Sequence, residues 1–435
     1  MRVEQALRLL PNLEALMPLR GLLLSSARPD ERVQWGSGGP YLTVGKRDVE
    51  PGELARTMAP VLAFVAQHIG ALYGAYVEAL ERQERNDAPG AVTALVGAGR
   101  LEEHVGRLSQ AQAWYEVALA LAETLQDRRP EVETLRAIGH VCLALGNYSE
   151  GARHYQRALV LSEAEFNQAG AVDASVGLGT AAFERAEWPG ARAWYSRALR
   201  LTEAGNDGRR LGLVEHRLGL LDRGQGDLAA AGDHLRRARE YFEKLNGGAA
   251  LDMARVLDAQ GELDAALGRP GPAAAAFREA LAWVRRDEHD PGLDVAIRLH
   301  LAELLLETGR WLEAEEEMRR AEQLAITSNE PRGLVRIYTV LGTLRGRQGD
   351  ETGFVFFEQA IALCRALEGP LVEDARVYHA YGLFRQVCGG PDEARAYLER
   401  ARGIFRSLGM DADVERVEAA LRNSHGVNTA AGGAG

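Results

Sequence analysis

The sequence predicts an all-α protein, a superhelical α-solenoid of eight helix-turn-helix repeats. Three residue types recur in register every 39–42 residues. The first is an alanine in the second helix of each repeat, at Ala118, Ala158, Ala198, Ala238, Ala280, Ala321, Ala360 and Ala401. The second is a small residue in the first helix, at Gly99, Gly139, Gly179, Gly219, Gly261, Ala302, Gly342 and Gly382. The third is a glycine between the helices, at Gly106, Gly146, Gly226, Gly268, Gly309, Gly349 and Gly389, replaced by Ala186 in the third copy.

Residues 133–161 show how one repeat is built. The first helix carries apolar side chains at helical spacing, and Gly139 lets a neighbouring helix approach closely. Gly146-Asn147 ends this helix, because both residue types tolerate the left-handed conformation of a helix end. The second helix begins at Tyr148, with Tyr155 three residues before the recurring alanine. One such hairpin cannot bury its apolar faces alone, so stacked copies are expected.

The pattern resembles the tetratricopeptide repeat, which carries a Leu-Gly pair, a Gly-Asp/Asn turn and an A-x-x-x-F/Y-x-x-A second helix. Leu178-Gly179 matches the pair, Gly226-Asp227 matches the turn, and Ala191, Tyr195 and Ala198 match the second helix. The usual repeat has ~34 residues. The longer period here resembles the variants of kinesin light chain and related adaptors, over roughly residues 90–405.

The segments outside the repeats are expected to differ in kind. Residues 1–56 form an N-terminal extension, in which alternating Val33, Trp35, Tyr41 and Thr43 predict a β-hairpin at 31–45. Two isolated strands are marginal in water. We therefore expect the hairpin to dock on the start of the solenoid, either as an end cap or as a removable plug across its groove.

The flanks of the repeats are expected to be helical. Residues 57–88 read as a capping helix before the eight repeats at 89–410, and residues 411–424 as a C-terminal capping helix. Residues 425–435 are expected to form a disordered tail. The uncharged run 57–77 raises the alternative of a membrane tether, but Gln67 and His68 interrupt it, so no membrane span is expected.

Composition narrows the function. A formal net charge of −11 argues against direct nucleic-acid binding. The three cysteines lack any metal-ligand spacing, so we expect no metal, no disulfide and a cytoplasmic location. No nucleophile elbow, HExxH or paired-carboxylate motif is present, so no catalytic residue, no enzyme activity and no cofactor are expected. The oligomeric state is left open.

The resemblance implies a non-catalytic adaptor that holds a partner protein segment or peptide in the concave groove lined by the first helices. The alternative is a sensory or regulatory subunit whose solenoid responds to a small peptide or metabolite. Carried over to this sequence, the groove positions and their neighbours one turn away are Arg136, His140, Thr180, His216, Arg223, Arg336, Thr339, Arg347, Arg376 and His379. The histidines belong to different repeats and are interpreted as separate groove residues. We expect the arginines to bind carboxylates.

Overall fold

The protein is almost wholly helical over the residues that its computed structural model describes. These are residues 31–36, 39–44, 47–48, 51–104, 106–245, 247–286, 290–328, 330–367, 371–408, 410 and 413–422. The described chain divides into two compact units, which are treated separately. Unit 1 is Ile69–Ala321, and unit 2 comprises residues 31–68 and 322–422. The all-α fold expected from the sequence is confirmed, whereas the single superhelix stays a prediction.

Three short strands precede the helices. β1 (Glu31–Gly36), β2 (Gly39–Val44) and β3 (Arg47–Asp48) form an antiparallel sheet in that order, with Glu31 opposite Val44. The hairpin expected at 31–45 includes residues outside the described ones. Its side chains also lie outside them, so its docking stays a prediction.

The first long helix, α2 (Pro51–Glu84), is longer at its N-terminal end than the capping helix expected over 57–88. Its C-terminal part belongs to unit 1, where Leu72, Tyr76 and Ala79 enter the core of the first repeat. In the part of the chain that the structure describes, no helix has both the length and the apolar character needed to cross a membrane.

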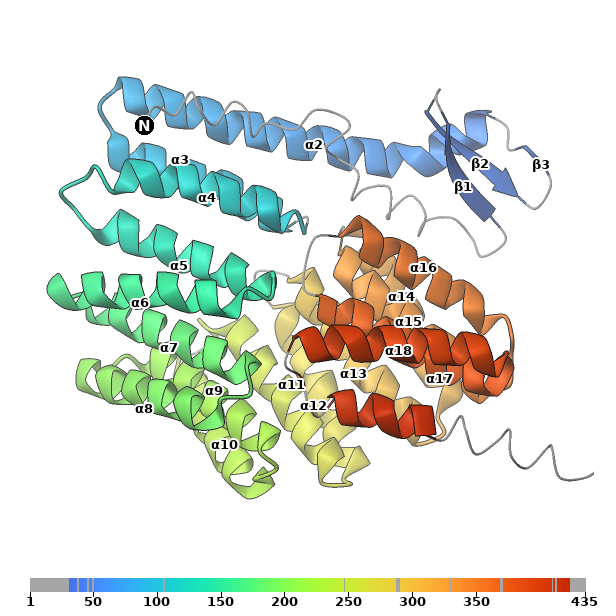
Figure 1. Cartoon of the computed structure of the whole chain (residues 1–435). Helices are drawn as coiled ribbons and strands as arrows, with labels where there is room; N and C mark the ends of the chain where they lie inside the picture. The colour runs from blue at the N-terminus through green and yellow to red at the C-terminus, as the bar shows by residue number, and fades with distance from the viewer. Residues whose placement is uncertain are drawn as a thin grey trace, which may run out of the picture. The chain divides into compact units, whose positions relative to one another are not determined.

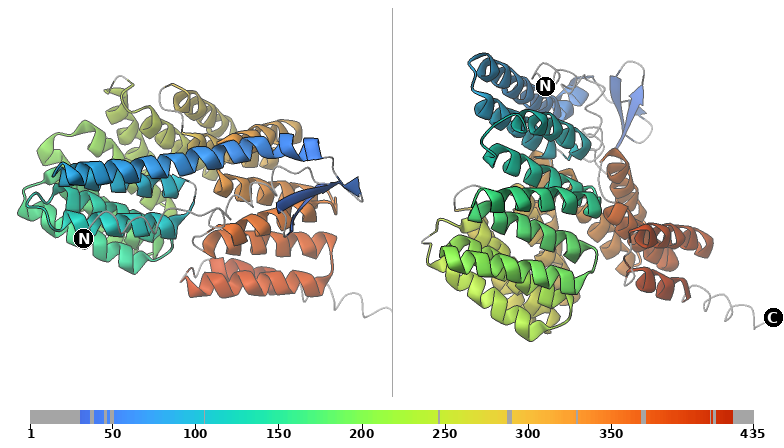
Figure 2. Two further views of the ribbon diagram at one scale, coloured as in Figure 1. Left: turned by 90° about the horizontal axis from the view of Figure 1, so that it is seen from above. Right: turned by 60° about the vertical axis from the view of Figure 1, so that its left-hand side comes forward.

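Unit 1 consists of paired helices. Its helices after α2 are α3 (Ala88–His104), α4 (Leu108–Ala122), α5 (Arg129–Ala144), α6 (Tyr148–Ala164), α7 (Gln168–Glu184), α8 (Trp188–Gly205), α9 (Gly208–Gly224), α10 (Leu228–Glu243), α11 (Ala250–Ala266), α12 (Pro270–Val284) and α13 (Pro291–Glu307). Each odd-numbered helix from α3 to α11 packs closely on the even-numbered helix that follows it. Figures 1 and 2 show these pairs stacked in chain order.

Unit 2 repeats the same pairing. After α14 (Trp311–Thr327), which runs from unit 1 into unit 2, its helices are α15 (Pro331–Arg347), α16 (Gly353–Ala366), α17 (Leu371–Cys388), α18 (Pro391–Ser407) and a last helix over residues 413–422. α15 packs on α16, and α17 packs on α18.

The recurring alanine marks the centre of every repeat. All eight marker alanines, Ala118 to Ala401, have no exposed surface. The residue three positions earlier is also buried in each copy, at Tyr115, Tyr155, Tyr195, Leu235, Phe277, Met318, Phe357 and Leu398. The repeat register inferred from the sequence is therefore the register in which the helices pack.

The small residue of the odd helix makes room for this large side chain. A Cβ added to Gly179 on α7 would lie 2.4 Å from Cε1 of Tyr195 on α8. The same holds for Gly99 against Tyr115 and for Gly261 against Phe277, at 2.3 and 2.5 Å. These approaches are too close for any side chain. The interdigitation of one large residue with one absent side chain sets the distance between the paired helices.

The turn between the helices is a left-handed C-cap. Gly146 has φ +79°, its N–H bonds to the carbonyl of Leu143 at 3.0 Å, and the N–H of Asn147 bonds to Cys142 at 2.8 Å. This is the Schellman pattern, which satisfies the last carbonyls of α5. Ala186 adopts the same conformation in the third repeat, with φ +57°. Gly389 occupies the same place in the sequence pattern but differs in conformation, because its φ is not positive.

The odd-numbered helices form one layer of unit 1. α3 contacts α5, α5 contacts α7, and this continues through α9 and α11 to α13. Among the described residues, no two consecutive even-numbered helices make a comparable contact. The odd helices therefore lie nearer to one another than the even ones do. We call the surface that they share the odd-helix face.

Substituting Gly179 tests the packing. We expect Gly179→Ala to lower the free energy of unfolding by ~1–3 kcal/mol, because the new methyl group overlaps the Tyr195 ring. Gly97→Ala on α3 is the matched control. Nothing lies within 4 Å of its added Cβ, so it should raise stability by ~1 kcal/mol through helix propensity. Urea unfolding measures the free energy of unfolding of both variants. Equal changes in the two would contradict the close contact between Gly179 and Tyr195.

Two separate variants, Ala186→Gly and Gly146→Ala, test the left-handed conformation of the turn. Ala186→Gly should stabilise the protein by ~1 kcal/mol, since a non-glycine residue at positive φ costs ~1–2 kcal/mol. Gly146→Ala should destabilise it by a similar amount for the same reason. Opposite shifts of the two melting temperatures are expected, and shifts in one direction would rule out the shared conformation.

Candidate functional site

Polar side chains from successive helices meet on the odd-helix face. At its N-terminal end, the His140 ring on α5 lies 2.7 Å from the Glu103 carboxylate on α3, Nδ1 to Oε1. The Tyr115 hydroxyl donates to the other oxygen of Glu103 at 2.9 Å. Burial has the largest single effect and raises the pKa of Glu103, but the hydrogen bonds from His140 and Tyr115 and the charges of His140 and Arg100 together outweigh it, so the net pKa is lowered. The Glu103 carboxylate is therefore ionised and held.

A chain of ion pairs joins the next three odd helices. Arg136 on α5 lies 2.9 Å from the Asp173 carboxylate on α7, Nη2 to Oδ2. Arg210 on α9 lies 3.2 Å from the other oxygen of Asp173 and also pairs with Asp207 at 2.6 Å. Arg136 was a predicted groove residue. Its partner in the neighbouring repeat was not predicted.

A second group of contacts joins α9, α11 and α13. Arg223 lies 2.6 Å from Glu262, and His300 Nδ1 lies 2.9 Å from Asp258. The ligand atoms of Asp258, Glu262 and His300 lie within 4.8 Å of one another and could hold a metal ion. The salt bridge from Arg223 and the hydrogen bond of His300 engage all three of these side chains.

Two of the predicted groove residues are occupied within the fold: His216 is buried, and the hydroxyl of Thr180 is hydrogen-bonded. His216 on α9 is 8% exposed, and burial, followed by the charges of Arg217 and Arg255, lowers its pKa to about 3. It is therefore a neutral, buried side chain. The Thr180 hydroxyl on α7 bonds to the carbonyl of Val176 at 3.0 Å and to the Tyr195 hydroxyl at 3.2 Å.

The remaining predicted residues lie in unit 2. Arg336, Thr339 and Arg347 are on α15, and Arg376 and His379 are on α17. The Thr339 hydroxyl donates to Val335 at 2.7 Å, and burial lowers the pKa of His379, as does Arg416. Arg347 and Arg376 are exposed and form no ion pair with another described residue. The ten predicted residues are thus divided between the units. In unit 1, Arg136, His140 and Arg223 each pair with a residue of a neighbouring repeat.

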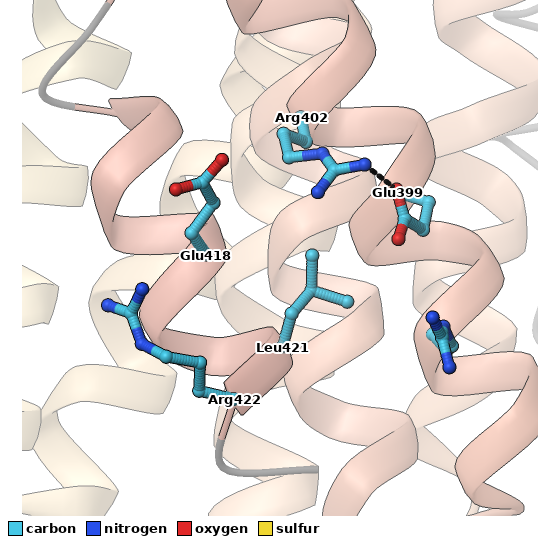
Figure 3. A pocket seen from close by; sticks show the side chains of 6 residues that line it. Glu399, Arg402, Glu418, Leu421 and Arg422 are labelled. Atoms are coloured by element: carbon cyan, nitrogen blue, oxygen red, sulfur yellow. Dashed lines mark hydrogen bonds and ion pairs between the residues drawn. The ribbon is translucent and has the colours of Figure 1, made fainter. Parts of the chain in front are cut away.

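Unit 2 also contains a pocket that the sequence did not indicate. It has a volume of about 360 Å³ and lies between α18 and the last helix. Figure 3 shows Leu421 of the last helix pointing toward Glu399 and Arg402 of α18, which pair with each other, with Glu418 and Arg422 on the same helix as Leu421. Arg406 on α18 pairs with Glu418 at 3.2 Å. Both carboxylates that line the pocket therefore have an arginine partner.

A smaller cavity in unit 1, about 260 Å³, lies where α7, α8 and α9 meet. Its lining includes Val172, Leu201, Thr202 and Arg210. No motif in the sequence marks the lining residues of either cavity. Their lining residues come from helices that only the folded chain places together.

Comparison with known proteins agrees with the geometry. Residues 136–206 and residues 210–285 each match a family model described as tetratricopeptide repeat. These two segments are tetratricopeptide repeats. They cover α5 to α12, the helices that provide most of the odd-helix face. No curated protein matches the chain.

Several solved structures are similar to this chain. A Rap protein complexed with competence and sporulation factor covers 83% of this chain and 98% of its own, with 15% identity and a TM-score of 0.53. The Rap conjugation gene regulator of plasmid pLS20, in complex with the Phr* peptide, covers 74% and 87%, with 15% identity and a TM-score of 0.49. BtubC from P. vanneervenii covers 60% and 92%, with 15% identity and a TM-score of 0.34. At such identity, the first similarity shows a shared fold alone.

The burial of His216 predicts a pH dependence. The folded pKa, about 3, lies below the ordinary 6.5, so only the unfolded chain takes up this proton as the pH falls. Stability from His216 is thus present above pH 6.5 and lost between pH 6.5 and 3, by up to ~1.4 kcal/mol per unit.

The test replaces the imidazole by an apolar side chain. His216→Leu should flatten the pH dependence of the unfolding free energy over that window, because the titrating imidazole is removed. Leucine should fit this site, since the buried Leu299 fills the equivalent place on α13. Carboxylates titrate in both proteins, so the difference between them isolates His216. Parallel curves would show that the imidazole titrates normally.

Proposed function

We propose that this protein is a non-catalytic scaffold that binds a partner protein segment or peptide on the odd-helix face. The observation that carries the proposal is the row of polar side chains contributed by successive tetratricopeptide repeats. Glu103 and His140, then Arg136 and Asp173, then Arg223 and Glu262 lie along consecutive odd helices.

Such a row suits an extended chain. A peptide lying across the helices meets donors and acceptors from several repeats, so its backbone and alternate side chains can be bound at once. The side chains of Arg136 and His140 are 36% and 65% exposed, which leaves part of each available to a partner. Because charged groups already hold one another, the face is ordered before the partner arrives, and less entropy is lost on binding.

A second candidate function is a sensory or regulatory subunit that responds to a small peptide or metabolite. The Rap protein of the same fold is complexed with competence and sporulation factor. In the present chain, the Arg136–Asp173–Arg210 contacts link α5, α7 and α9. A ligand that replaced one of these contacts would change the spacing of the three helices, and this gives the alternative a physical route.

The binding proposal predicts where a ligand protects the backbone. Peptides selected from a phage-displayed random library on the full-length protein should slow amide hydrogen exchange in α5, α7 and α9. They should do so more than in α6, α8 and α10, because the odd helices carry the proposed contacts. Arg136→Gln should weaken binding of the selected peptides about tenfold, as expected for the loss of a charged hydrogen bond.

Arg200→Gln is the matched control for this experiment. Arg200 is exposed on α8 and forms no ion pair with another described residue, so its loss should leave binding unchanged. Failure to select any peptide, or protection confined to the even helices, would contradict the proposal. A change in exchange that spreads to helices outside the bound region would favour the regulatory alternative.

A further inference from the structure

Three tyrosines reach the odd-helix face from the even helices. Tyr115, Tyr155 and Tyr195 come from α4, α6 and α8. The ring of Tyr155 passes between two odd helices. A Cβ added to Gly139 of α5 would lie 2.8 Å from Cε2 of this ring, and a Cβ added to Gly177 of α7 would lie 2.3 Å from Cε1. The absent side chains on both helices thus let the ring extend toward the face.

The three hydroxyls differ in their partners. The Tyr115 hydroxyl donates to Glu103, and the Tyr195 hydroxyl bonds to Thr180. The Tyr155 side chain is only 6% exposed, yet its hydroxyl makes no hydrogen bond to another described residue. Its oxygen is not one of the fully enclosed side-chain atoms that lack a partner in the described chain, so it reaches the surface and can donate to a group from outside the chain.

Two arginines act on this hydroxyl. Burial raises the pKa of Tyr155 to about 12, and the positive charges of Arg136 and Arg217 oppose the rise. Arg217 on α9 stands forty residues after Gly177, at the equivalent place of the next repeat. Its charge also acts on Tyr195 and His216. It is exposed and forms no ion pair with another described residue.

The acidic groups nearby are already neutralised by other side chains. Asp173 is shared by Arg136 and Arg210, so Arg136 is not fully compensated by it. Glu103, whose charge also acts on Tyr155, is held by His140 and Tyr115. The Tyr155 hydroxyl is therefore a neutral donor within reach of the charge of Arg217, an exposed guanidinium that forms no ion pair with another described residue.

We propose that Tyr155, Arg217 and Arg136 form a subsite that binds a carboxylate of the peptide ligand. The inference rests on the proposed function and assigns the chemical group recognised there. A guanidinium binds a carboxylate through two parallel N–H bonds, and the phenol supplies a third donor. The subsite belongs to this part of unit 1, because the equivalent residues of later repeats, Leu235, Phe277, Met318, Phe357 and Leu398, carry no hydroxyl.

The test uses an immobilised library of hexapeptides in which each Asp- or Glu-containing sequence has an Asn or Gln twin. The full-length protein should bind the best acidic members about tenfold more tightly than their amide twins, the effect expected for charged hydrogen bonds. Arg217→Gln and Tyr155→Phe should each reduce this ratio to near one. Their melting temperatures should stay close to that of the unaltered protein, because neither group is bonded to another described residue.

Matched variants exclude unspecific effects. Arg200→Gln removes an exposed arginine from α8, and Tyr241→Phe removes a hydroxyl from α10, so both should keep the preference for acidic members. Peptide binding without any acidic preference, or a preference that survives both Arg217→Gln and Tyr155→Phe, would overturn the subsite and leave the proposed function standing. A larger gain from phosphoserine than from glutamate would also overturn the carboxylate assignment. Binding of no peptide at all would overturn the proposed function itself.

Discussion

The insertion of one large side chain into the gap left by one missing side chain governs this structure. Tyr195 against Gly179 and Phe277 against Gly261 are two examples of the same contact. It fixes how closely the two helices of a repeat approach, and the fully buried alanine one turn later completes the interface. Because overlap at such distances is strongly repulsive, the contact admits one register only. Every later feature of unit 1 depends on that register.

The same contact connects packing with the candidate site. A tyrosine can end on the odd-helix face only where the odd helices carry glycine, as Tyr155 does between Gly139 and Gly177. Replacing tyrosine with leucine or phenylalanine, as in Leu235 and Phe277, preserves the core and removes the hydroxyl. Repeats that are equivalent in packing are therefore unequal in chemistry, and the hydroxyls gather in the first three repeats.

Charges on the odd-helix face contribute little to stability and suit the recognition proposed for it. The Arg136–Asp173 and Arg223–Glu262 pairs each join neighbouring repeats, and both are partly exposed. Exposed ion pairs add little to stability, typically under ~1 kcal/mol each. Their stronger effect is to hold the side chains in defined positions. A partner with its own charges then meets an ordered surface, on which the exposed Arg217 remains available.

The sequence by itself determined the helices, the turns and the repeat register. A period of about forty residues, with small and large residues at fixed places, admits few other folds, because only stacked hairpins bury that pattern. It also identified Arg136, His140 and Arg223 as residues of the first helices. The tertiary structure alone decided their partners, since Asp173, Glu103 and Glu262 belong to other repeats. It also decided that His216 is buried, and that the hydroxyl of Tyr155, unlike those of Tyr115 and Tyr195, makes no hydrogen bond to another described residue. These outcomes depend on contacts across about forty residues of chain, which residue type and spacing do not specify.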